Sequence, residues 1–437
     1  MLSTLDLRGT ERSAAVLASL VPRADNDVSS VVSVVSALID DVVARGEGAL
    51  RDQADKFDGG APQSLRIAAP EMRRALLGLD AGVRSALEAA ISRVREVSLA
   101  QVPSGRDTLL APGARVEQRW IPVTRVGLYV PGGQAVYPSS VVMNVVPAQV
   151  AGVTSIALVS PPQREFDHGV HPTILAAAEL LGLDEVYAMG GAGAIAALAH
   201  GIPSLDLEPV DVITGPGNVF VAAAKRLVRG LVGIDSEAGP TEILIIADIT
   251  ANPRFVAADL ISQAEHDVMA AGVLVTDSVD LADAVKREVE QLTTETHHRA
   301  RVIKALSGSQ SAIVLVDDMN HAVEFSNAYA PEHLEVQVSD PEALLSRLTN
   351  AGAIFVGPNA PVSLGDYSAG SNHILPTVGQ ARFSSAVGAY TFLRAQQVIR
   401  YDKAALLGVA PEIRALADAE NLPAHGDAVE IRFAKGD

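Results

Sequence analysis

One stretch of the sequence, APEHL at residues 330–334, sets a carboxylate directly beside an imidazole. Pro331 ends the helical pattern before it and stiffens the backbone at the pair. A histidine titrates near neutral pH and can take a proton from a reacting hydroxyl, while a carboxylate can activate water. Glu332 and His333 can therefore share acid–base chemistry. The alternative is a glutamate that caps a helix beside a hydrogen-bonded, structural histidine.

Two further places have residue types that bind metals. Gln263 and His266 are three residues apart at the end of a predicted helix, so they share one face and can present two ligands to one ion. The same pair is also ordinary surface or capping chemistry. The polar stretch GDYSAGSNHILPT, residues 365–377, contains Asp366 and His373. Loops of this composition often carry function, although a turn-rich connection has the same letters.

Two glycine-rich turns join a predicted strand to a predicted helix. Residues 191–196, GAGAIA, match the dinucleotide fingerprint G-x-G-x-x-A, for which the expected acid about 20 residues on is Asp206 or Asp211. Neither acid sits clearly at the end of a second strand, and a small-residue turn that packs a helix on a sheet explains the same letters. Residues 215–218, GPGN, can receive a phosphate on backbone N–H groups or can be a tight turn with an Asn cap.

The composition excludes several functional classes. The 437 residues include 48% hydrophobic and only 4% aromatic side chains, which suits an α/β protein with aliphatic strands. A net charge of −18 disfavours nucleic acid and anionic membranes as partners. With no cysteine, disulfides, thiolate zinc ligands and a cysteine nucleophile are ruled out. We expect a cytoplasmic protein, since neither a secretory signal nor a long apolar span is visible.

The hydrophobic periodicity predicts the elements that must position these residues. Residues 1 to about 100 have helical patterns, chiefly over 28–57 and 71–100. From about residue 124 strands and helices alternate, which predicts parallel sheets covered on both faces, in two α/β units that meet near residue 241. A helix over 139–153 should be bent or split by Pro147. The last fifty residues show helix-like stretches at 386–399 and 410–420, followed by a polar tail.

Taken together and in this order, the motifs resemble the histidinol dehydrogenases. The stretches that carry the resemblance lie between about residues 125 and 425: RVGLYVPGG, MGGAGAIAALAHG, TGPGNVFVAAAKR, AGPTEILIIAD, DLISQAEHD, APEHLE, GDYSAGSNHILPT and AENLPAH. The resemblance implies a zinc- and NAD-dependent oxidation of L-histidinol to L-histidine through bound L-histidinaldehyde, the last steps of histidine biosynthesis. It also implies a homodimer whose intertwined tails share the active sites.

The resemblance carries roles to individual positions. It implies one zinc ion per subunit on Gln263, His266, Asp366 and His425, a ligand set of nitrogen and oxygen that agrees with the missing cysteines. Glu332 and His333 match the catalytic pair. Substrate contacts match Thr241, His373 and Glu420 beside the zinc ligands and the catalytic pair, and NAD contacts match Tyr129, Gly193 and Asn218.

Three positions depart from the family pattern. Gly193 stands where glutamine is frequent, so a hydrogen bond to the cofactor is in doubt. Thr241 replaces a frequent serine but keeps the hydroxyl. Val362 stands in the loop before Asp366 where an acid is frequent. None of the three removes a proposed zinc ligand or the catalytic pair.

The resemblance implies two incomplete Rossmann-like α/β domains with parallel sheets, plus small N- and C-terminal helical segments. The expected boundaries are an N-terminal helical segment at 1–24 and a split first large domain at 25–128 and 242–386. The second large domain, on the NAD side, is inserted at 129–241, and residues 387–437 form a tail domain that reaches the partner subunit.

Two rival functions stay open at the level of the sequence. The first is a related enzyme that uses the same scaffold on another alcohol, such as a sulfonated diol; His373 and Glu420, which suit an imidazole-bearing amino alcohol, argue against it. The second is a non-catalytic, metal-stabilised scaffold, which has no use for the acid–base pair of Glu332 and His333.

Overall fold

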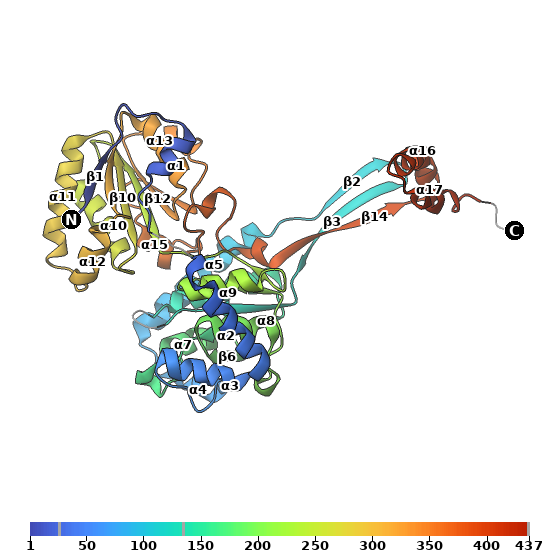
Figure 1. The fold of residues 1–437 in the computed structure, drawn as a ribbon, viewed down its shortest axis with the longest axis horizontal. Coiled ribbons are helices and arrows are strands. Elements are labelled where there is room, and N and C mark those ends of the chain that lie inside the picture. The colour runs from blue at the N-terminus through green and yellow to red at the C-terminus, as the bar shows by residue number, and fades with distance from the viewer. Residues whose placement is uncertain (25–27, 133–135, 435–437) are drawn as a thin grey trace. The chain divides into compact units, whose positions relative to one another are not determined.

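The computed structural model describes residues 1–24, 28–132 and 136–434, which form two compact units. The first unit comprises residues 1–101 together with 124–392, and the second comprises residues 102–123 together with the chain from 393 onward. Figure 1 shows the ribbon with its elements labelled. Each unit is therefore built from two segments that are separate in the sequence.

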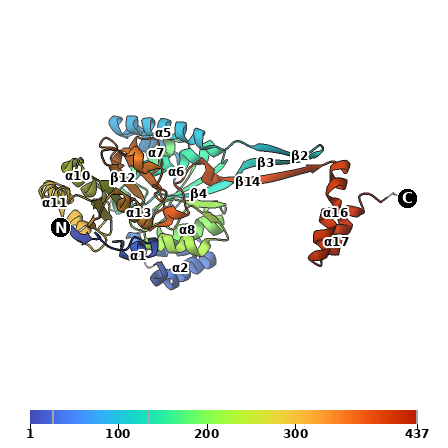
Figure 2. The same ribbon diagram turned by 90° about the horizontal axis from the view of Figure 1, so that it is seen from above.

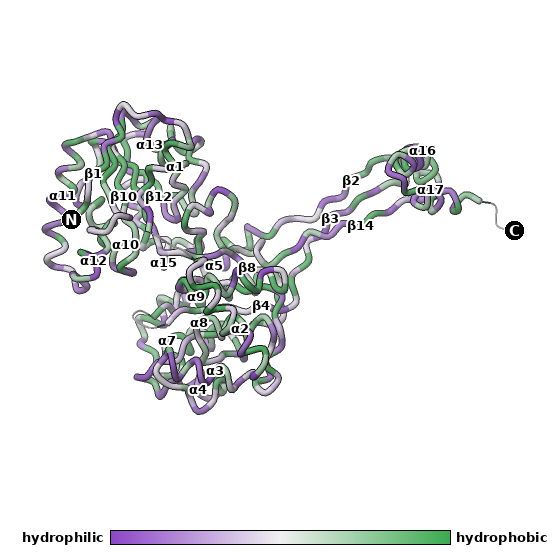
Figure 3. The backbone as a smooth tube through the Cα atoms, viewed as in Figure 1, coloured by the Kyte–Doolittle hydropathy of each residue, from purple (hydrophilic) through white to green (hydrophobic). Residues whose placement is uncertain are grey.

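Six parallel strands form the larger sheet of the first unit, in the order β1-β11-β10-β9-β12-β13. Strands β9, β10 and β11 are buried along their whole length, which suits their largely aliphatic sequences, and Figure 3 shows this sheet mainly in the colour of apolar residues. Helices α10, α11 and α12 pack on one face, and α1 and α13 pack on the other. The strands are β1 Ser3–Asp6, β9 Glu242–Ala247, β10 Ala271–Thr276, β11 Ala312–Leu315, β12 His333–Gln337 and β13 Ala353–Val356, and the helices are α1 Ala14–Leu20, α10 Pro253–Ala264, α11 Val279–Thr293, α12 Arg299–Leu306, α13 Met319–Tyr329, α14 Glu342–Leu345 and α15 Val362–Tyr367.

Five parallel strands form the second sheet of this unit, in the order β6-β5-β4-β7-β8. The chain starts at the central strand β4, adds β5 and β6 on one side, and then returns to add β7 and β8 on the other. Helices α6 and α7 pack against each other, as do α8 and α9. Crossovers in parallel sheets are right-handed as a rule, which puts these two pairs on opposite faces of the sheet. The bounds are β4 Arg125–Tyr129, β5 Ser155–Ser160, β6 Glu185–Ala188, β7 Val212–Thr214, β8 Gly233–Ile234, α6 Pro138–Ala151, α7 Pro172–Leu180, α8 Gly191–His200 and α9 Val219–Val228.

The N-terminal helices surround the five-stranded sheet. Helix α2 (Val32–Arg45) packs on α8 and α9, α3 (Glu47–Gln53) packs on α8, α4 (Ala69–Leu77) packs on α7, and α5 (Ala81–Gln101) packs on α6. Figure 2 shows α5 as a long helix beside α6 and α7. The family resemblance implies that residues 25–128 belong to the domain of the other sheet, whereas α2 to α5 pack on the helices of the five-stranded sheet. Helical periodicity identifies the buried face of each helix but not the sheet on which that face packs.

Two of the expected elements differ in the first unit. The segment 1–24 is not purely helical, because Ser3–Asp6 pairs in register with Ala312–Leu315 as an edge strand. Helix α6 runs without interruption through Pro147, so the proline does not split it. Ten of the residues around this proline are also buried, and tertiary packing stabilises a helix that local propensity disfavours.

The second unit is an antiparallel sheet of three strands, in the order β14-β3-β2, with two helices. The helix expected over 386–399 is wrong: residues 393–401 form β14, which pairs with β3 along its full length. Part of the polar tail is also helical, since residues 423–430 form α17. Pro423 is in the first turn of this helix, where a proline is tolerated. The bounds are β2 Arg106–Ala111, β3 Ala114–Pro122, β14 Leu393–Tyr401, α16 Lys403–Ala419 and α17 Pro423–Glu430. Within the described ranges, no helix is long and apolar enough to cross a membrane.

Candidate active site

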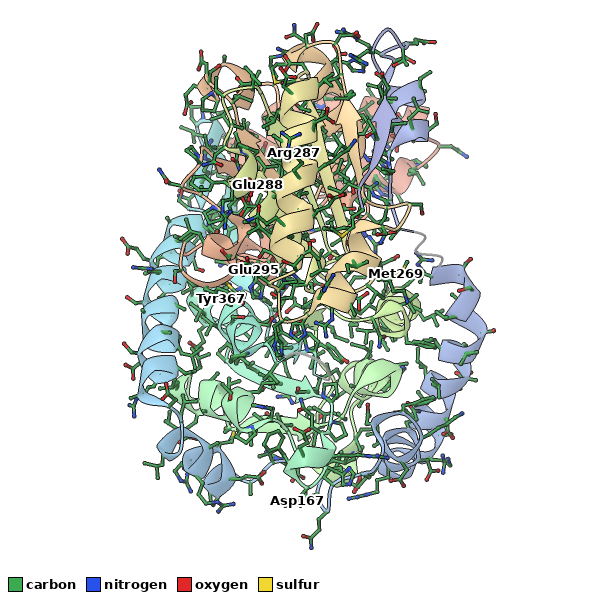
Figure 4. The ribbon with its side chains drawn as sticks, turned by 90° about the vertical axis from the view of Figure 1, so that its left-hand side faces the viewer. Asp167, Met269, Arg287, Glu288, Glu295 and Tyr367 are labelled. Carbon is green, nitrogen blue, oxygen red and sulfur yellow. The ribbon has the colours of Figure 1, made fainter. Side chains whose placement is uncertain are left out.

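A cavity of about 1340 Å³ lies in the first unit, lined by residues of both sheets. The five-stranded sheet contributes the segments that follow its strands, including Tyr129, Gly191 and Asn218. The six-stranded sheet contributes the residues at the beginning of β9 and β12. The carboxyl edge of one sheet thus faces the amino edge of the other across the cavity. Figure 4 labels Met269 and Tyr367, two lining residues, at the level where the two halves of the unit meet.

The strand order makes one edge of this cavity a typical nucleotide site. The chain reverses direction across β4, so the carboxyl ends of β4 and β7 form a topological switch point. Open α/β sheets bind their ligands in the crevice at such a point. Tyr129 ends β4, and the turn that follows β7 contains Gly215, whose φ of +119° brings its Cα against the Tyr129 carbonyl; a Cβ there would lie 2.0 Å from that oxygen. Glycine is therefore required at this turn.

Glu332 and His333 lie at the other side of the cavity, both buried. Glu332 Oε2 accepts hydrogen bonds from the Thr241 hydroxyl at 2.6 Å and from the backbone N–H of Glu242 at 2.9 Å. Burial raises the pKa of Glu332 to about 7, against the lowering effect of these two hydrogen bonds. The carboxyl can therefore exchange a proton near neutral pH.

The tautomer of His333 follows from its partner. Nδ1 lies 3.2 Å from the backbone oxygen of Glu242, which can only accept, so Nδ1 carries the proton and Nε2 keeps its lone pair. Burial also lowers the pKa of His333, which favours the neutral ring. A neutral imidazole with a free Nε2 is the form that a general base requires. Glu332 Oε2 lies 3.5 Å from the same Nδ1.

A chain of hydrogen bonds joins Gln263 to the Glu332 carboxyl. Gln263 Nε2 lies 2.5 Å from the Thr241 hydroxyl oxygen, and that hydroxyl donates to Glu332. Since the hydroxyl has a single hydrogen, Gln263 must donate to it, which fixes the orientation of the amide. Gln263 is 1% exposed, and its Oε1 is a buried acceptor with no partner among the described residues. A buried oxygen that accepts no hydrogen bond from the protein is available as a ligand for a cation.

His266 and Asp366 line the cavity beside this glutamine. His266 follows α10, and its Nδ1 donates to the carbonyl oxygens of Ser262 and Gln263 in the last turn of that helix at 3.2 and 3.3 Å, so Nε2 keeps its lone pair. Asp366 is in the short helix α15, and its backbone oxygen accepts from His373 Nδ1 at 3.1 Å. His373 Nε2 in turn accepts from the Ser140 hydroxyl at 2.9 Å, so both of its ring nitrogens are engaged within the protein.

The other two residues of the implied zinc and substrate site belong to the second unit. Glu420 ends α16 and His425 is in α17, and both are exposed. Among the described residues no three His, Cys, Asp or Glu side chains are gathered to hold a metal. Glutamine, which is one of the implied zinc ligands, is not among these residue types, and the four implied zinc ligands are divided between the two units. The donors in the first unit nevertheless fit a metal, because they are nitrogen and oxygen atoms and Gln263 Oε1 lacks a partner.

The three residues expected to contact NAD have different structural roles. The buried Tyr129 hydroxyl accepts from the backbone N–H of Gly191 at 3.3 Å. Asn218 Oδ1 accepts from Phe220 and Val221, so this residue caps α9 as well as lining the cavity. Gly193 lies inside α8, where a Cβ would be 2.5 Å from Gln53 Oε1.

The space beside Gly193 is filled by Gln53 of α3. Its amide nitrogen donates to the Leu38 oxygen at 3.1 Å, and the residue lines the cavity. The glycine that departs from the family pattern is therefore matched by a glutamine from a different helix. No signal in the sequence points to Gln53, because the contact depends on how α3 packs on α8.

Neither acid proposed for the fingerprint lies at the cavity. Asp211 accepts from the backbone of Thr124 and Arg125, and Asp206 pairs with Arg66. The acid that does line the cavity near Tyr129 is Asp58, whose pKa burial raises to about 6. Asp58 ends a π-helical turn, Ala54–Asp58, and such turns are frequent at functional sites. No pattern in the sequence points to Asp58.

The fold and the cavity define the class of protein: a parallel α/β enzyme in which a nucleotide-type switch point faces a buried Glu–His pair. The family profile of the histidinol dehydrogenases matches residues 21–433. Histidinol dehydrogenase of Leifsonia xyli subsp. xyli is 64% identical over 432 residues, covering 99% of each chain. That of Mycobacterium tuberculosis strain H37Rv is 56% identical and covers 100% of this chain and 99% of the relative.

A solved structure agrees with these sequences. The crystal structure of histidinol dehydrogenase from Elizabethkingia anophelis superposes with a TM-score of 0.92 at 32% identity, covering 99% of this chain and 98% of that one. The chain belongs to the histidinol dehydrogenase family and is an oxidoreductase. This confirms the family and the α/β fold class that the sequence predicted.

Proposed function

We propose that this protein oxidises L-histidinol to L-histidine in two steps, using two NAD, as the last steps of histidine biosynthesis. The observation that carries the proposal is the pair of hydrogen bonds made by the Glu242 backbone, which is buried with both side chains. Its C=O holds His333 in the neutral form that can act as a base, and its N–H holds Glu332 beside that ring. Both face a cavity whose other edge is a nucleotide-type switch point. Hydride transfer needs a base next to the alcohol and a dinucleotide within reach.

In the first step His333 Nε2 removes the hydroxyl proton while hydride passes from the alcohol carbon to NAD. The products are the aldehyde, NADH and one proton. The second step adds water to the aldehyde, since no cysteine exists to trap it. Glu332 activates that water, and the gem-diol then gives a second hydride to a second NAD while His333 again takes the proton. Four electrons leave the substrate, and one water oxygen enters the product.

A zinc ion, held by Gln263, His266, Asp366 and His425, would fix the substrate by its imidazole and amino nitrogens. The free Oε1 of Gln263 and the free Nε2 of His266 support these ligands. Thr241, His373 and Glu420 would complete the substrate site, and Tyr129, Gly193 and Asn218 the NAD site. Of these, Tyr129 and Asn218 line the cavity, while Gly193 contacts Gln53, which does.

We propose that the enzyme is a cytoplasmic homodimer whose tails complete the partner's sites. Two observations support the dimer: Glu420 and His425 are exposed in a unit separate from the other ligands, and that unit exposes large apolar side chains. These are Leu109, Leu110, Ile399, Leu407, Leu416 and Ile431, each between 57% and 71% exposed. Exposed apolar area of this extent marks a protein interface.

Counting NADH released per histidinol consumed tests the reaction. We expect two NADH per substrate and L-histidine as product. One NADH per substrate with free aldehyde would contradict the two-step reaction. Turnover of another alcohol in preference to histidinol would favour the rival substrate, and zinc binding without any NAD reduction would favour a scaffold.

Removing the metal tests the role of zinc. A strong chelator should abolish histidinol oxidation, and added zinc should restore it. Gln263→Ala should weaken zinc binding in a direct titration, because it removes the buried acceptor that lacks a partner. Full activity in protein verified as free of metal would contradict the proposal.

A further inference from the structure

The peptide groups of one residue, Glu242, hold both members of the catalytic pair. Its N–H donates to Glu332 Oε2 at 2.9 Å, and its C=O accepts from His333 Nδ1 at 3.2 Å. The β9–β12 ladder begins with Ile243 opposite His333, so it stops one residue short of Glu242. On the side of β12, the Glu242 N–H is therefore bound by the Glu332 carboxyl instead of by another strand, and the Glu242 C=O, at the end of the ladder, also accepts from the His333 ring.

The side chain of Glu242 is anchored by three hydrogen bonds from two residues. Arg23 Nε lies 3.1 Å from Oε2 and Nη2 lies 3.3 Å from Oε1, so the guanidinium grips the carboxylate with two nitrogens. The backbone N–H of Val378 donates to Oε1 at 3.1 Å. Glu242 is 2% exposed and the Arg23 side chain 19%. A bidentate pair of this kind fixes direction as well as charge.

Arg23 is itself held in place. It donates to the backbone oxygen of Tyr329, and its guanidinium lies 4.3 Å from the centroid of the Tyr329 ring. Gly379, with φ of +74°, gives the guanidinium room, because a Cβ there would lie 2.9 Å from Nη1. The N-terminal segment, α13 and the loop after residue 377 thus converge on the one carboxylate whose backbone orients the catalytic residues.

We infer that the Arg23–Glu242 ion pair is a positioning device for the catalytic pair, which keeps the proton of His333 on Nδ1 and Nε2 free. The inference rests on the proposed roles of Glu332 and His333. A shift of the Glu242 backbone would move both of its peptide groups, so Glu332 and His333 would lose their orientation together. Neither Arg23 nor Glu242 touches the cavity, so substrate and metal contacts stay as they are.

Three variants test this: Arg23→Met, Glu242→Gln and the two combined. The matched control is Arg125→Met, which breaks a similarly buried bidentate pair, Arg125–Glu185, at the amino end of β4 and away from the cavity. The ring tautomer of His333 is read from 15N shifts of histidine-labelled protein, assigned with His333→Gln. The kinetic constants for histidinol and NAD and the unfolding midpoints are measured on the same samples.

We expect Arg23→Met to lower kcat on the order of 10- to 100-fold, the loss typical of a misplaced catalytic group. The KM for histidinol should change by less than about threefold, since binding contacts are unchanged. The Nδ1–H signature of His333 should be lost or mixed. The double variant should lose less than the product of the single losses, because both changes break one unit. Arg125→Met should lose stability but keep the tautomer and kcat.

If Arg23→Met keeps both the Nδ1–H tautomer of His333 and the wild-type kcat, as expected of Arg125→Met, the inference is overturned. If Arg23→Met does not fold, Arg23→Lys takes its place, because lysine keeps the charge but cannot bind the carboxylate with two nitrogens. This variant should also lose the Nδ1–H tautomer of His333 in part or in full. An unchanged tautomer in a folded Arg23→Lys and Glu242→Gln would equally overturn it. Because the tautomer is read without substrate, it decides the positioning role even if the wild-type protein does not oxidise histidinol.

Discussion

Glu332 accepts both of its hydrogen bonds, from Thr241 and from the Glu242 backbone, on the same oxygen, Oε2. The two donors hold one edge of the carboxyl fixed. A chain of hydrogen bonds leads from Gln263 through Thr241 to this carboxyl, which connects a proposed zinc ligand to the group that we propose activates water. Substitutions at these residues should therefore separate the two chemical steps.

Glu332→Gln should affect the two steps unequally. Alcohol oxidation needs only His333 as base, whereas aldehyde oxidation also needs a carboxylate to activate water. The second step should slow by about 10²–10⁴-fold and the first by much less. Single-turnover assays that start from histidinol and from histidinaldehyde measure the two rates separately. Thr241→Ser, which keeps the hydroxyl, is the control, and equal losses in both steps would assign Glu332 another role.

The contact between Gly193 and Gln53 predicts a second residue-scale result. Gly193→Gln forces a side chain into the space of Gln53, which is nearly buried, so the free energy of unfolding should fall by about 1–3 kcal/mol. The KM for NAD should rise as well. Combining it with Gln53→Ala frees the space and should recover part of both losses. Additive effects on stability and on KM would show that the two sites do not compete for one space.

At the scale of the elements, strand β12 carries its polar side chains on one face. His333, Glu335 and Gln337 alternate with two apolar residues of the opposite face. Glu335 Oε1 accepts from the backbone N–H of Val362, the first residue of α15. Gln337 Nε2 donates to Glu335 at 2.9 Å and to Asp259 of α10 at 3.2 Å. One strand thus positions the base at its start and anchors the helix that carries Asp366.

Glu335 and Asp259, which both accept from Gln337, are a pair of largely buried acids that predicts a pH dependence of the free energy of unfolding. Burial raises the pKa of Glu335 to about 8 from 4.5, and burial also raises that of Asp259. A carboxyl with a raised pKa in the folded state holds its proton more tightly there than in the unfolded chain. Its contribution to stability is therefore complete below about pH 4.5 and is lost as the pH rises through about 8.

Glu335→Gln should consequently flatten the fall in stability between pH 5 and 8. Urea unfolding at several pH values, compared with wild type, measures the difference in slope. Glu412→Gln, at an exposed position of α16, is the control and should leave the slope unchanged. A variant whose slope over this range equals that of wild type would show that Glu335 is ionised in the folded protein.

At the scale of the whole molecule, the proposed site is divided between two compact units. The first contains the catalytic pair, the cavity and three of the four proposed zinc ligands, and the second contains His425 and Glu420. A tail that crosses a two-fold axis is an ordinary way for a homodimer to share a site. The exposed apolar side chains of the second unit are the surface that such an exchange would cover.

Mixed dimers test the shared site. His425→Ala and His333→Ala should each be nearly inactive alone. In a mixed dimer with exchanged tails, one site receives an intact His425 and keeps its own His333, while the other carries both defects. Activity should then return to about half per mixed dimer, by counting sites. If subunit exchange is confirmed and no activity returns, each tail serves its own subunit.

The sequence by itself determined the family and the parallel α/β class, and it singled out Glu332 and His333 as a candidate acid–base pair. The alternation of aliphatic strands with amphipathic helices is a local pattern, and Glu332 and His333 are neighbours in the chain. Both are therefore visible without any knowledge of packing. The zinc ligands and the NAD contacts came from the resemblance and remain predictions.

Only the tertiary structure decided which distant residues meet. Arg23 reaches Glu242, Gln263 reaches Thr241, and Gln53 fills the space at Gly193 because sheet register and helix packing bring them together. The same holds for β14, whose apolar residues also fit a helical period but pair with β3 along nine residues. Periodicity specifies which face of an element is buried, whereas the partner of that face depends on the whole chain.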